Sequence, residues 1–182
     1  MTRCMIVGAS PAHDKAEPMI ETGDPIAFAA ALPAGRRLFG LDLGSKTIGV
    51  AVSDERFLIA TPLVTLTRVK FGKDAAALIE LANQHDVGAY VLGLPINMDG
   101  SEGPRAQSTR AFARNLVPLD GRPIFFWDER LSTAAVTRTL LEADASRRRR
   151  DEVVDKLAAS FILQGFLDRL HLAARADDPR RL

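Results

Sequence analysis

The sequence contains one cysteine and no long apolar segment. Because Cys4 is the only cysteine among 182 residues, an internal disulfide framework is excluded, and a reducing compartment is the simpler expectation. No run approaches the ~20 apolar residues that a membrane-spanning helix needs, and the N-terminus lacks the charged-then-apolar pattern of a secretory signal. We therefore expect a cytoplasmic protein with no membrane partner.

The chain also lacks an excess of charge of either sign. Its 24 Lys and Arg residues stand against 23 Asp and Glu residues, which gives a formal net charge of +1 at pH 7. Overall charge therefore does not identify a nucleic-acid-binding protein, and a site for a polyanion must come from local clustering. With 47% hydrophobic and 26% charged residues, the composition is that of a globular domain with a substantial core.

Three regions are predicted from the pattern along the chain. Residues 1–35 include "SPAHDKAEPMIETGDP", with three prolines and no sustained periodicity, which predicts a mostly disordered arm with a short helix at "IAFAAAL". Residues 36–175 have regular periodicity and form the predicted domain. Residues 176–182 are predicted to be a flexible tail.

Within the domain, the pattern predicts strands at 36–44, 46–54, 58–66, 87–95 and 122–129, and helices at 72–86, 103–116, 131–143 and 151–170. The short "GSK" between the first two strands predicts an antiparallel hairpin. Helices connect the first, fourth and fifth strands, so these should be parallel and adjacent. The predicted fold class is α/β, with a mixed five-stranded sheet whose first three strands are antiparallel, followed by parallel crossovers, and with flanking helices.

An acidic residue interrupts the apolar strand in "GLDLGSKTIGVAVSD". Alternation along a strand places Asp42 on the same face as Gly40 and Gly44, with the leucines on the other face. Asp42 thus projects from a face that is nearly bare, where a polyanion or a metal ion could approach. The alternative is an acid of the hairpin turn that is hydrogen-bonded locally.

Two further acidic positions could share a site with Asp42. Asp128 and Glu129 end the strand in "FFWDERLST", and ligands bind at the carboxyl ends of strands in α/β sheets. Adjacent strand residues face opposite ways, so one of the two should reach the site; Glu129 is favoured, and Asp128 is its competitor. Either could instead be a first-turn acid of the next helix.

The last predicted helix carries Asp155 in line with Ala158, Ala159 and Ile162. Its buried stripe is predicted to comprise Val154, Leu157, Ala158, Phe161 and Ile162. Small residues would let the helix approach the sheet closely and carry Asp155 toward the strand ends. The alternative is a solvated acid paired with Lys156 or with the arginine run.

Crowded carboxylates destabilise a fold unless cations neutralise them. Oxygen ligands alone suit Mg²⁺ or Mn²⁺ rather than zinc, and neither a Cys pair nor a histidine lies near these acids in the pattern. Two such ions about 3.5–4 Å apart can activate a water and stabilise the leaving oxygen of a phosphodiester. We therefore predict that Asp42, Glu129 and Asp155 are the catalytic residues and that they hold two Mg²⁺ or Mn²⁺ ions, with Asp128 as the alternative ligand to Glu129.

A second group of residues could hold the polyanion. Turn residues including Asn97 precede a helix N-terminus, and Gln107, Arg110 and Arg114 share one helix face. Such faces and charge runs are also commonly solvated surface. The complete predicted nucleic-acid-binding set is Lys46, Asn97, Arg105, Gln107, Arg110, Arg114, Arg130 and the run Arg147, Arg148, Arg149 and Arg150. Trp127 is expected in the core rather than as a base-stacking platform.

Four ordered motifs, "GLDLGSKTIGVAVSD", "GLPINMDGSEGPRAQ", "DERLSTAAV" and "VDKLAASFILQ", resemble the YqgF family of ribonuclease H-like proteins over residues 36–170. The resemblance implies an RNase H-like fold and a nuclease that processes precursor 16S ribosomal RNA or resolves Holliday junctions. The family's three acids fall on Asp42, Glu129 and Asp155. The departures are the N-terminal arm and Trp127, where the family usually has a smaller apolar residue.

The favoured function is a metal-dependent nuclease, a hydrolase acting on phosphodiester bonds, with structured precursor 16S ribosomal RNA as substrate in ribosome biogenesis. One alternative is a Holliday junction resolvase acting on branched DNA. Another is a non-catalytic RNA-binding assembly factor. The first motif also resembles the phosphate-binding hairpin of actin-like ATPases and sugar kinases, but 182 residues leave no room for their duplicated domain. A monomer or weak dimer is expected.

Overall fold

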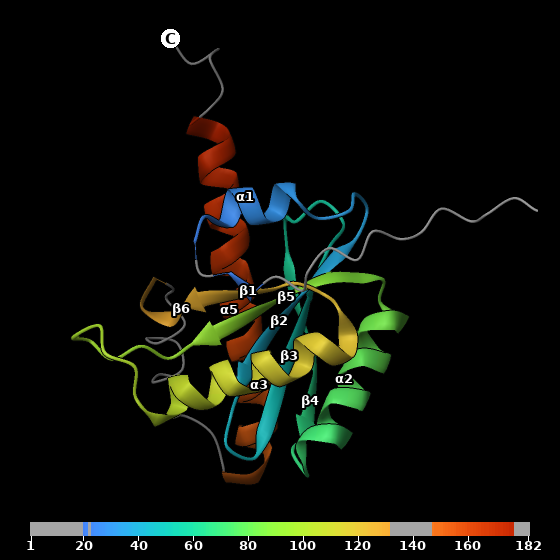
Figure 1. The fold of residues 1–182 in the computed structure, drawn as a ribbon, viewed down its shortest axis with the longest axis vertical. Coiled ribbons are helices and arrows are strands. Elements are labelled where there is room, and N and C mark those ends of the chain that lie inside the picture. Colours follow the sequence, from blue (N-terminus) through green and yellow to red (C-terminus); the bar gives the residue numbers. More distant parts are fainter. Residues whose placement is uncertain (1–19, 22, 132–146, 177–182) are drawn as a thin grey trace, which may run out of the picture.

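The computed structural model describes residues 20–21, 23–131 and 147–176. Its centre is a sheet with the strand order β1-β6-β5-β2-β3-β4 (Figure 1). The strands are β1 (Ile20–Glu21), β2 (Arg37–Leu43), β3 (Thr47–Ser53), β4 (Ala60–Thr67), β5 (Val87–Leu94) and β6 (Ile124–Asp128). Among the described residues, no helix has the length and apolar character needed to cross a membrane.

The strand directions confirm the predicted mixed sheet and the RNase H-like fold class. β2, β3 and β4 are antiparallel neighbours, whereas β5 pairs in parallel with both β2 and β6. The hairpin and the parallel crossovers were both expected from the connection lengths. The five predicted strands are all present, and the two-residue β1 adds a sixth at the β6 edge, where it pairs in parallel.

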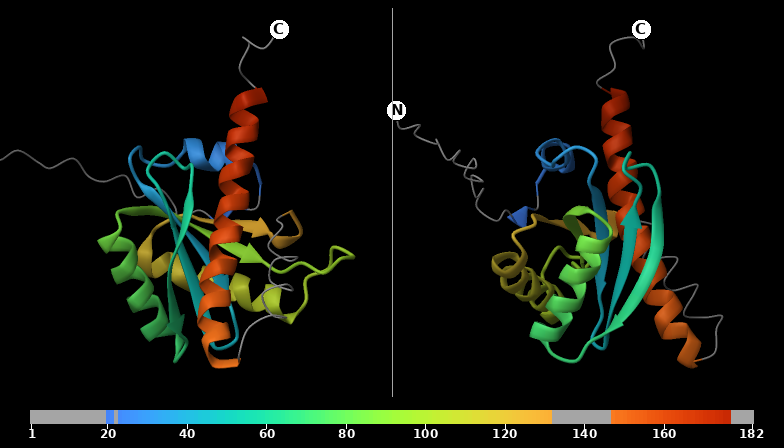
Figure 2. Two further views of the ribbon diagram at one scale, coloured as in Figure 1. Left: turned by 180° about the vertical axis from the view of Figure 1, so that it is seen from behind. Right: turned by 90° about the vertical axis from the view of Figure 1, so that its right-hand side faces the viewer.

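Helices cover both faces of the sheet (Figure 2). They are α1 (Pro25–Ala30), α2 (Phe71–Gln84), α3 (Pro104–Asp120), the short 3₁₀ helix η1 (Glu129–Leu131) and α5 (Arg147–Ala176). α2 and α3 pack against one face through Leu78, Phe112 and their neighbours, and α5 packs against the other through Ile162 and Phe166. The helix predicted at 131–143 falls mainly on residues 132–146, which lie outside the described residues.

Of the arm at residues 1–35 that was predicted to be mostly disordered with one short helix, the structure describes residues 20–21 and 23–35. β1 joins the sheet, and α1 confirms the predicted short helix, with Asp24 accepting a hydrogen bond from the N–H of Ile26. Phe28 is fully buried, with its ring centroid 5.2 Å from that of Phe125 and 6.2 Å from that of Phe166. The buried ring of Phe28 thus holds α1 on the domain, because burying such a ring is strongly favourable. Residues 1–19 and 177–182 lie outside the described residues.

An ion-pair network stabilises the end of the sheet where β5 and β6 begin. This end is opposite the strand ends that carry Asp128 and Asp42. The guanidinium of Arg122 pairs with Asp120 and donates to the Asn83 side chain at 2.5 Å and to the Val87 carbonyl at 2.8 Å. The hydroxyl of Tyr90 donates to Asp120 at 2.6 Å. Burial and this bond to a carboxylate raise the pKa of Tyr90, so its phenol stays neutral and remains a donor.

Replacing Arg122 with methionine is expected to lower the free energy of unfolding by about 3–5 kcal/mol, because it leaves a buried carboxylate without its cation. The Asp120 side chain is only 3% exposed. Urea denaturation measures the effect. The matched control is Arg36→Met, which breaks an exposed pair with Asp86 and should change the free energy by about 0–1 kcal/mol. Equal effects of the two substitutions would show that the pair of Arg122 and Asp120 stabilises the fold no more than the exposed pair does.

Candidate active site

Helix α5 lies directly against β2 and β3 because both strands have glycines beneath it. A Cβ atom added to Gly40 would lie 2.6 Å from the carbonyl oxygen of Ala159, and one added to Gly49 would lie 2.0 Å from that of Asp155. Glycine inside a strand commonly marks such a close backbone approach. The turns of α5 at Asp155 and Ala159 therefore lie on the sheet with no side chain between the two backbones.

The buried stripe of α5 differs from the predicted one. Leu157 and Phe161 are half-buried, and the side chain of Val154 lies outside the described part of the chain. The fully buried positions are Ala158, Ala159, Ile162, Leu163, Phe166 and Leu167. The stripe is rotated toward Ala159 and Leu163 because these residues sit over the bare backbone at Gly40.

Asp42 lies within β2 on the face that α5 covers. Its side chain is buried, with the residue only 2% exposed. It pairs across the ladder with Gly49 of β3, and the adjacent pair of Leu41 and Leu92 places it beside Gly93 of β5. Asp42 is thus a strand residue with a glycine beside it on each neighbouring strand. The alternative, in which Asp42 is an acid of the hairpin turn, does not apply.

The two competing acids at the end of β6 point in different directions. Asp128 accepts hydrogen bonds from its neighbour Arg130, the shortest 2.7 Å long, and these bonds lower the pKa of Asp128. The Oε1 atom of Glu129 lies 2.8 Å from where a Cβ of Gly93 would stand, on the α5 face. Glu129 therefore lies over the strand position next to Asp42, as alternation along β6 predicts.

Asp155 is half-buried in the third turn of α5. The hydroxyl of Thr47 donates to its Oδ2 atom at 2.5 Å, and its carbonyl oxygen lies over Gly49. Because Gly49 is the ladder partner of Asp42, Asp155 and Asp42 belong to one patch of the sheet.

The three predicted acids thus come from neighbouring positions on one face of the sheet, with the main chain of Asp155 over Gly49 on one side of Asp42 and the side chain of Glu129 over Gly93 on the other. The donor set is entirely carboxylate oxygen, which suits a hard divalent cation, and the glycine positions let α5 and the Glu129 side chain approach the sheet closely beside Asp42. In the described ranges, however, no three His, Cys, Asp or Glu side chains are already grouped as a metal site. Asp155 is instead turned onto the hydroxyl of Thr47.

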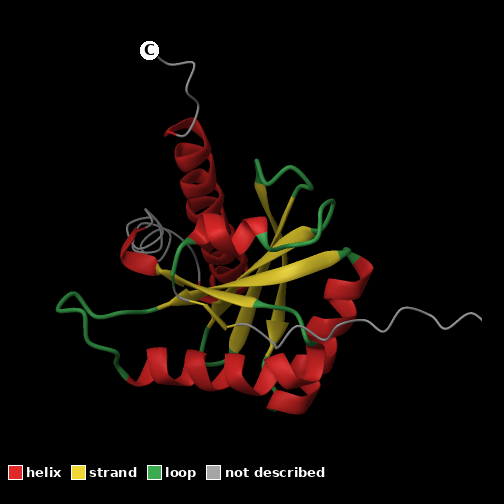
Figure 3. Cartoon of the chain, turned by 45° about the horizontal axis from the view of Figure 1, so that its top comes forward, coloured by secondary structure: helices red, strands yellow, loops and turns green. Residues whose placement is uncertain are grey.

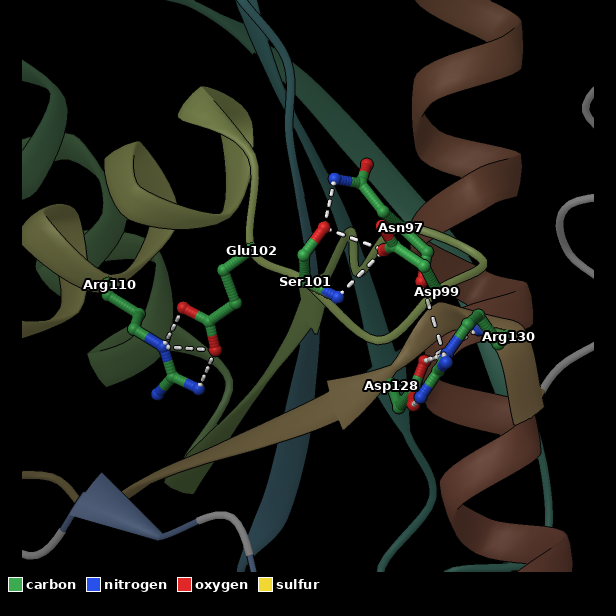
Figure 4. Close-up of polar contacts among 7 residues, drawn as sticks. All are labelled: Asn97, Asp99, Ser101, Glu102, Arg110, Asp128 and Arg130. Atoms are coloured by element: carbon green, nitrogen blue, oxygen red, sulfur yellow. Dashed lines mark hydrogen bonds and ion pairs between the residues drawn. The ribbon is translucent and has the colours of Figure 1, made fainter.

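Two arginines predicted to bind nucleic acid form ion pairs within the chain (Figure 4). Arg110 makes hydrogen bonds to Glu102 through Nε and Nη2, which lower the pKa of Glu102, and its guanidinium lies 4.8 Å from the ring centroid of Phe126. Arg130 pairs with Asp128. The charges of both arginines are therefore largely offset where they stand.

The rest of the predicted set lies on the surface or outside the described side chains. Lys46, Asn97, Arg105, Gln107 and Arg114 are exposed. The Asn97 side chain donates to the Ser101 hydroxyl at 3.0 Å. The run 147–150 forms the first turn of α5 rather than a preceding loop, and its side chains are not among those described.

Three residues of the site were not predicted from the sequence. Gly49 and Gly93 flank Asp42 on the neighbouring strands, and Thr47 orients Asp155. A glycine within an otherwise β-branched strand, as in "KTIGVAVSD", was an available signal for close backbone approach. Thr47 had no such signal, because a threonine near a strand start is ordinary. Trp127 is buried and packs edge-on against Phe166, which confirms its predicted core position.

Comparisons with known proteins place the chain in a family. The model of the RuvX family, described as Holliday junction resolvase, matches residues 36–169. A protein of Methylocella silvestris named "Putative pre-16S rRNA nuclease" is 63% identical over 135 residues, which cover 74% of this chain and 84% of that protein. A Rhodobacter capsulatus protein of the same name is 64% identical over 149 residues, covering 82% and 94%. Among solved structures, Thermus thermophilus RuvC in complex with Holliday junction substrate is 12% identical with a TM-score of 0.49, covering 75% of this chain and 96% of that chain.

Proposed function

Because the chain belongs to the RuvX family, we propose that it is a metal-dependent nuclease that hydrolyses phosphodiester bonds in the precursor of 16S ribosomal RNA. The names of relatives that share 63% and 64% of their aligned residues with it support this substrate. The observation that supports this chemistry is the position of Asp42. It is buried between Gly49, which lies beneath Asp155, and Gly93, which lies beneath Glu129.

The three acids are proposed to hold Mg²⁺ or Mn²⁺, most simply as a pair of ions. Such an ion supplies Lewis-acid stabilisation of the negative charge that develops on a phosphodiester under attack. Asp42 is suited to this role because strand pairing and burial restrict its side chain, so little ordering is needed when a ligand arrives. The hydrogen bond from the Thr47 hydroxyl restricts the carboxylate of Asp155.

Basic and polar side chains are proposed to position the nucleic acid. Exposed Lys46 lies next to Thr47 at the start of β3, and Arg105 and Arg114 are exposed on α3. Together with Asn97, Gln107 and the arginines at the start of α5, they can contact phosphates on either side of the acids. Arg110 and Arg130 would reach phosphate only by sharing their charge with Glu102 and Asp128.

The test compares labelled precursor 16S ribosomal RNA with a four-way DNA junction, each in Mg²⁺, in Mn²⁺ and in EDTA. We expect cleavage of the RNA that requires a divalent cation. Cleavage of the junction alone would favour the resolvase named by the family description. Binding of RNA without cleavage in either metal would favour a non-catalytic assembly factor, and cleavage in EDTA would contradict the metal dependence.

Glu129→Gln and Asp128→Asn form a matched pair for the acid at the end of β6. We expect Glu129→Gln to lower the cleavage rate by at least about a hundredfold, because it removes a charge that faces Asp42. Asp128→Asn should lower the rate less than about fivefold, because Asp128 is turned onto Arg130. Rates are measured at saturating RNA. A larger effect at Asp128 than at Glu129 would reverse the assignment.

A further inference from the structure

The connection between β5 and α3 projects beyond the body of the domain, beside the end of β6 (Figures 1 and 3). Met98 lies at its tip and is 91% exposed, the highest fraction among the exposed large apolar residues of the described chain. Single exposed apolar side chains are common on protein surfaces. What distinguishes Met98 is the structure that holds it there.

The loop is braced by its own hydrogen bonds (Figure 4). The N–H of Gly100 donates to the carbonyl of Asn97 at 2.9 Å, and Gly100 has a φ of 86°, so residues 97–100 form a tight turn with Met98 at its first corner. Ser101 donates to the Asp99 carboxylate through its N–H at 2.9 Å and its hydroxyl at 2.6 Å. These bonds lower the pKa of Asp99.

Two ion pairs flank the base of the loop. Glu102 pairs with Arg110 of α3, and Asp128 pairs with Arg130, whose guanidinium also lies 3.5 Å from the Asn97 carbonyl. The charges of these two pairs offset each other, and the Asp99 carboxylate beside Met98 accepts its hydrogen bonds from the neutral Ser101, so the surface directly below Met98 is neutral to acidic. Such a surface favours an apolar contact at the tip more than a phosphate contact.

The loop also lies close to the acids. It begins directly after β5, whose Gly93 lies beneath Glu129, and Arg130 links it to the end of β6. A phosphodiester placed over Asp42 would therefore bring its adjoining nucleotides to this loop. The thioether side chain of methionine is flexible and polarizable and packs well on aromatic rings, and methionine is among the side chains that proteins insert between bases.

We propose that Met98 stacks on an unpaired base next to the cleaved bond and so selects substrates with a single-stranded or distorted segment at the site. This inference rests on the proposed nuclease function and assigns it a substrate-positioning residue. No part of the turn itself needs a methionine, since the hydrogen bonds that close it join Asn97 to Gly100 and Ser101 and do not involve residue 98.

The test uses hairpin RNAs with 2-aminopurine in a single-stranded segment beside the duplex, and a fully paired RNA for comparison. Binding is measured in EDTA, where no cleavage occurs, for wild type, Met98→Gln, Met98→Leu and the control Leu119→Gln. Leu119 is also exposed, at 60%, but at the far end of α3. We expect Met98→Gln to weaken binding of the single-stranded segment about tenfold and to abolish the fluorescence change, with Met98→Leu restoring both.

In the cleavage assay, Met98→Gln should raise KM about tenfold with a smaller change in kcat, because stacking contributes to binding of the ground state. Equal binding by wild type and Met98→Gln, or an equal loss for Leu119→Gln, overturns the inference. Absence of any RNA binding by the wild type overturns it as well. Binding that depends on Met98 without any cleavage overturns the proposed nuclease function and leaves the base contact standing.

Discussion

Asp42→Asn is expected to reduce the rate of RNA cleavage by about a thousandfold, which corresponds to several kcal/mol of transition-state stabilisation. Asparagine has nearly the same shape, so the buried packing of Asp42 beneath α5 should persist. RNA binding in EDTA should also persist, because the basic residues that are proposed to contact phosphate are unchanged. Single-turnover cleavage and RNA-binding measurements on the same preparations test both expectations.

Asp74→Asn is the matched control, because Asp74 is also a buried acid, at 6% exposed, but it lies at the start of α2 and accepts the N–H of Val69 at 3.0 Å. It should keep the wild-type cleavage rate even if stability falls. Undiminished cleavage by a clean preparation of Asp42→Asn would exclude the proposed mechanism.

The same substitution separates metal binding from catalysis. A ligand that binds only the folded state raises its stability, so Mg²⁺ or Mn²⁺ should raise the thermal unfolding temperature of the wild type. Asp42→Asn should lose this shift and, in EDTA, should be at least as stable as the wild type, because one of three crowded negative charges is gone. A shift of the same size in both proteins would show that the ion binds elsewhere.

The part of the site on the sheet could be predicted from sequence because strand geometry is nearly rigid. Period-two alternation is sufficient to place Asp42 on the face opposite Leu41 and to separate Glu129 from Asp128. The structure agrees at each of these positions. Connection lengths were likewise sufficient for the antiparallel hairpin and the parallel crossovers.

The contribution of α5 was harder to predict, because helix rotation depends on what lies underneath. The sequence of α5 alone favoured a stripe through Leu157 and Phe161, whereas the bare backbone at Gly40 selects Ala159 and Leu163. The charge of the arginine run at 147–150 predicts a loop. Arginine nevertheless has a high helix propensity, and these residues form the first turn of α5. The contact between Thr47 and Asp155 joins residues 108 positions apart, and local patterns contain no information about it.

The ordering of the segment around Phe28 shows the same limit. The run "IAFAAAL" predicts a short helix, but the sequence pattern does not indicate that this helix packs on the domain through the burial of Phe28 against Phe125 and Phe166. That contact depends on a cluster assembled from β6 and α5, nearly a hundred residues or more further along the chain.

Gly49→Ala is expected to lower the free energy of unfolding by roughly 3 kcal/mol or more, at the upper end of what overpacking of a core causes. The added methyl group would stand 2.0 Å from the carbonyl oxygen of Asp155, and a backbone atom cannot move aside as a side chain can. The turn of α5 that contains Asp155 must therefore move away from β3, which also separates Asp155 from Thr47 and Asp42. Urea denaturation measures the stability, and the cleavage rate is measured on the folded fraction.

Substitutions at two other glycines, compared with Gly49→Ala, distinguish an effect on the site from an effect on the fold alone. Gly72→Ala, in the first turn of α2 with nothing within 4 Å, should be neutral or stabilising by about 0.5–1 kcal/mol. Gly93→Ala would meet side-chain atoms, Cδ1 of Ile162 at 2.5 Å and Oε1 of Glu129 at 2.8 Å, which can shift. It should therefore destabilise the fold less than Gly49→Ala yet still impair cleavage, because it displaces Glu129. If Gly93→Ala folded normally and cleaved at the wild-type rate, the position of Glu129 over Gly93 would have no part in catalysis.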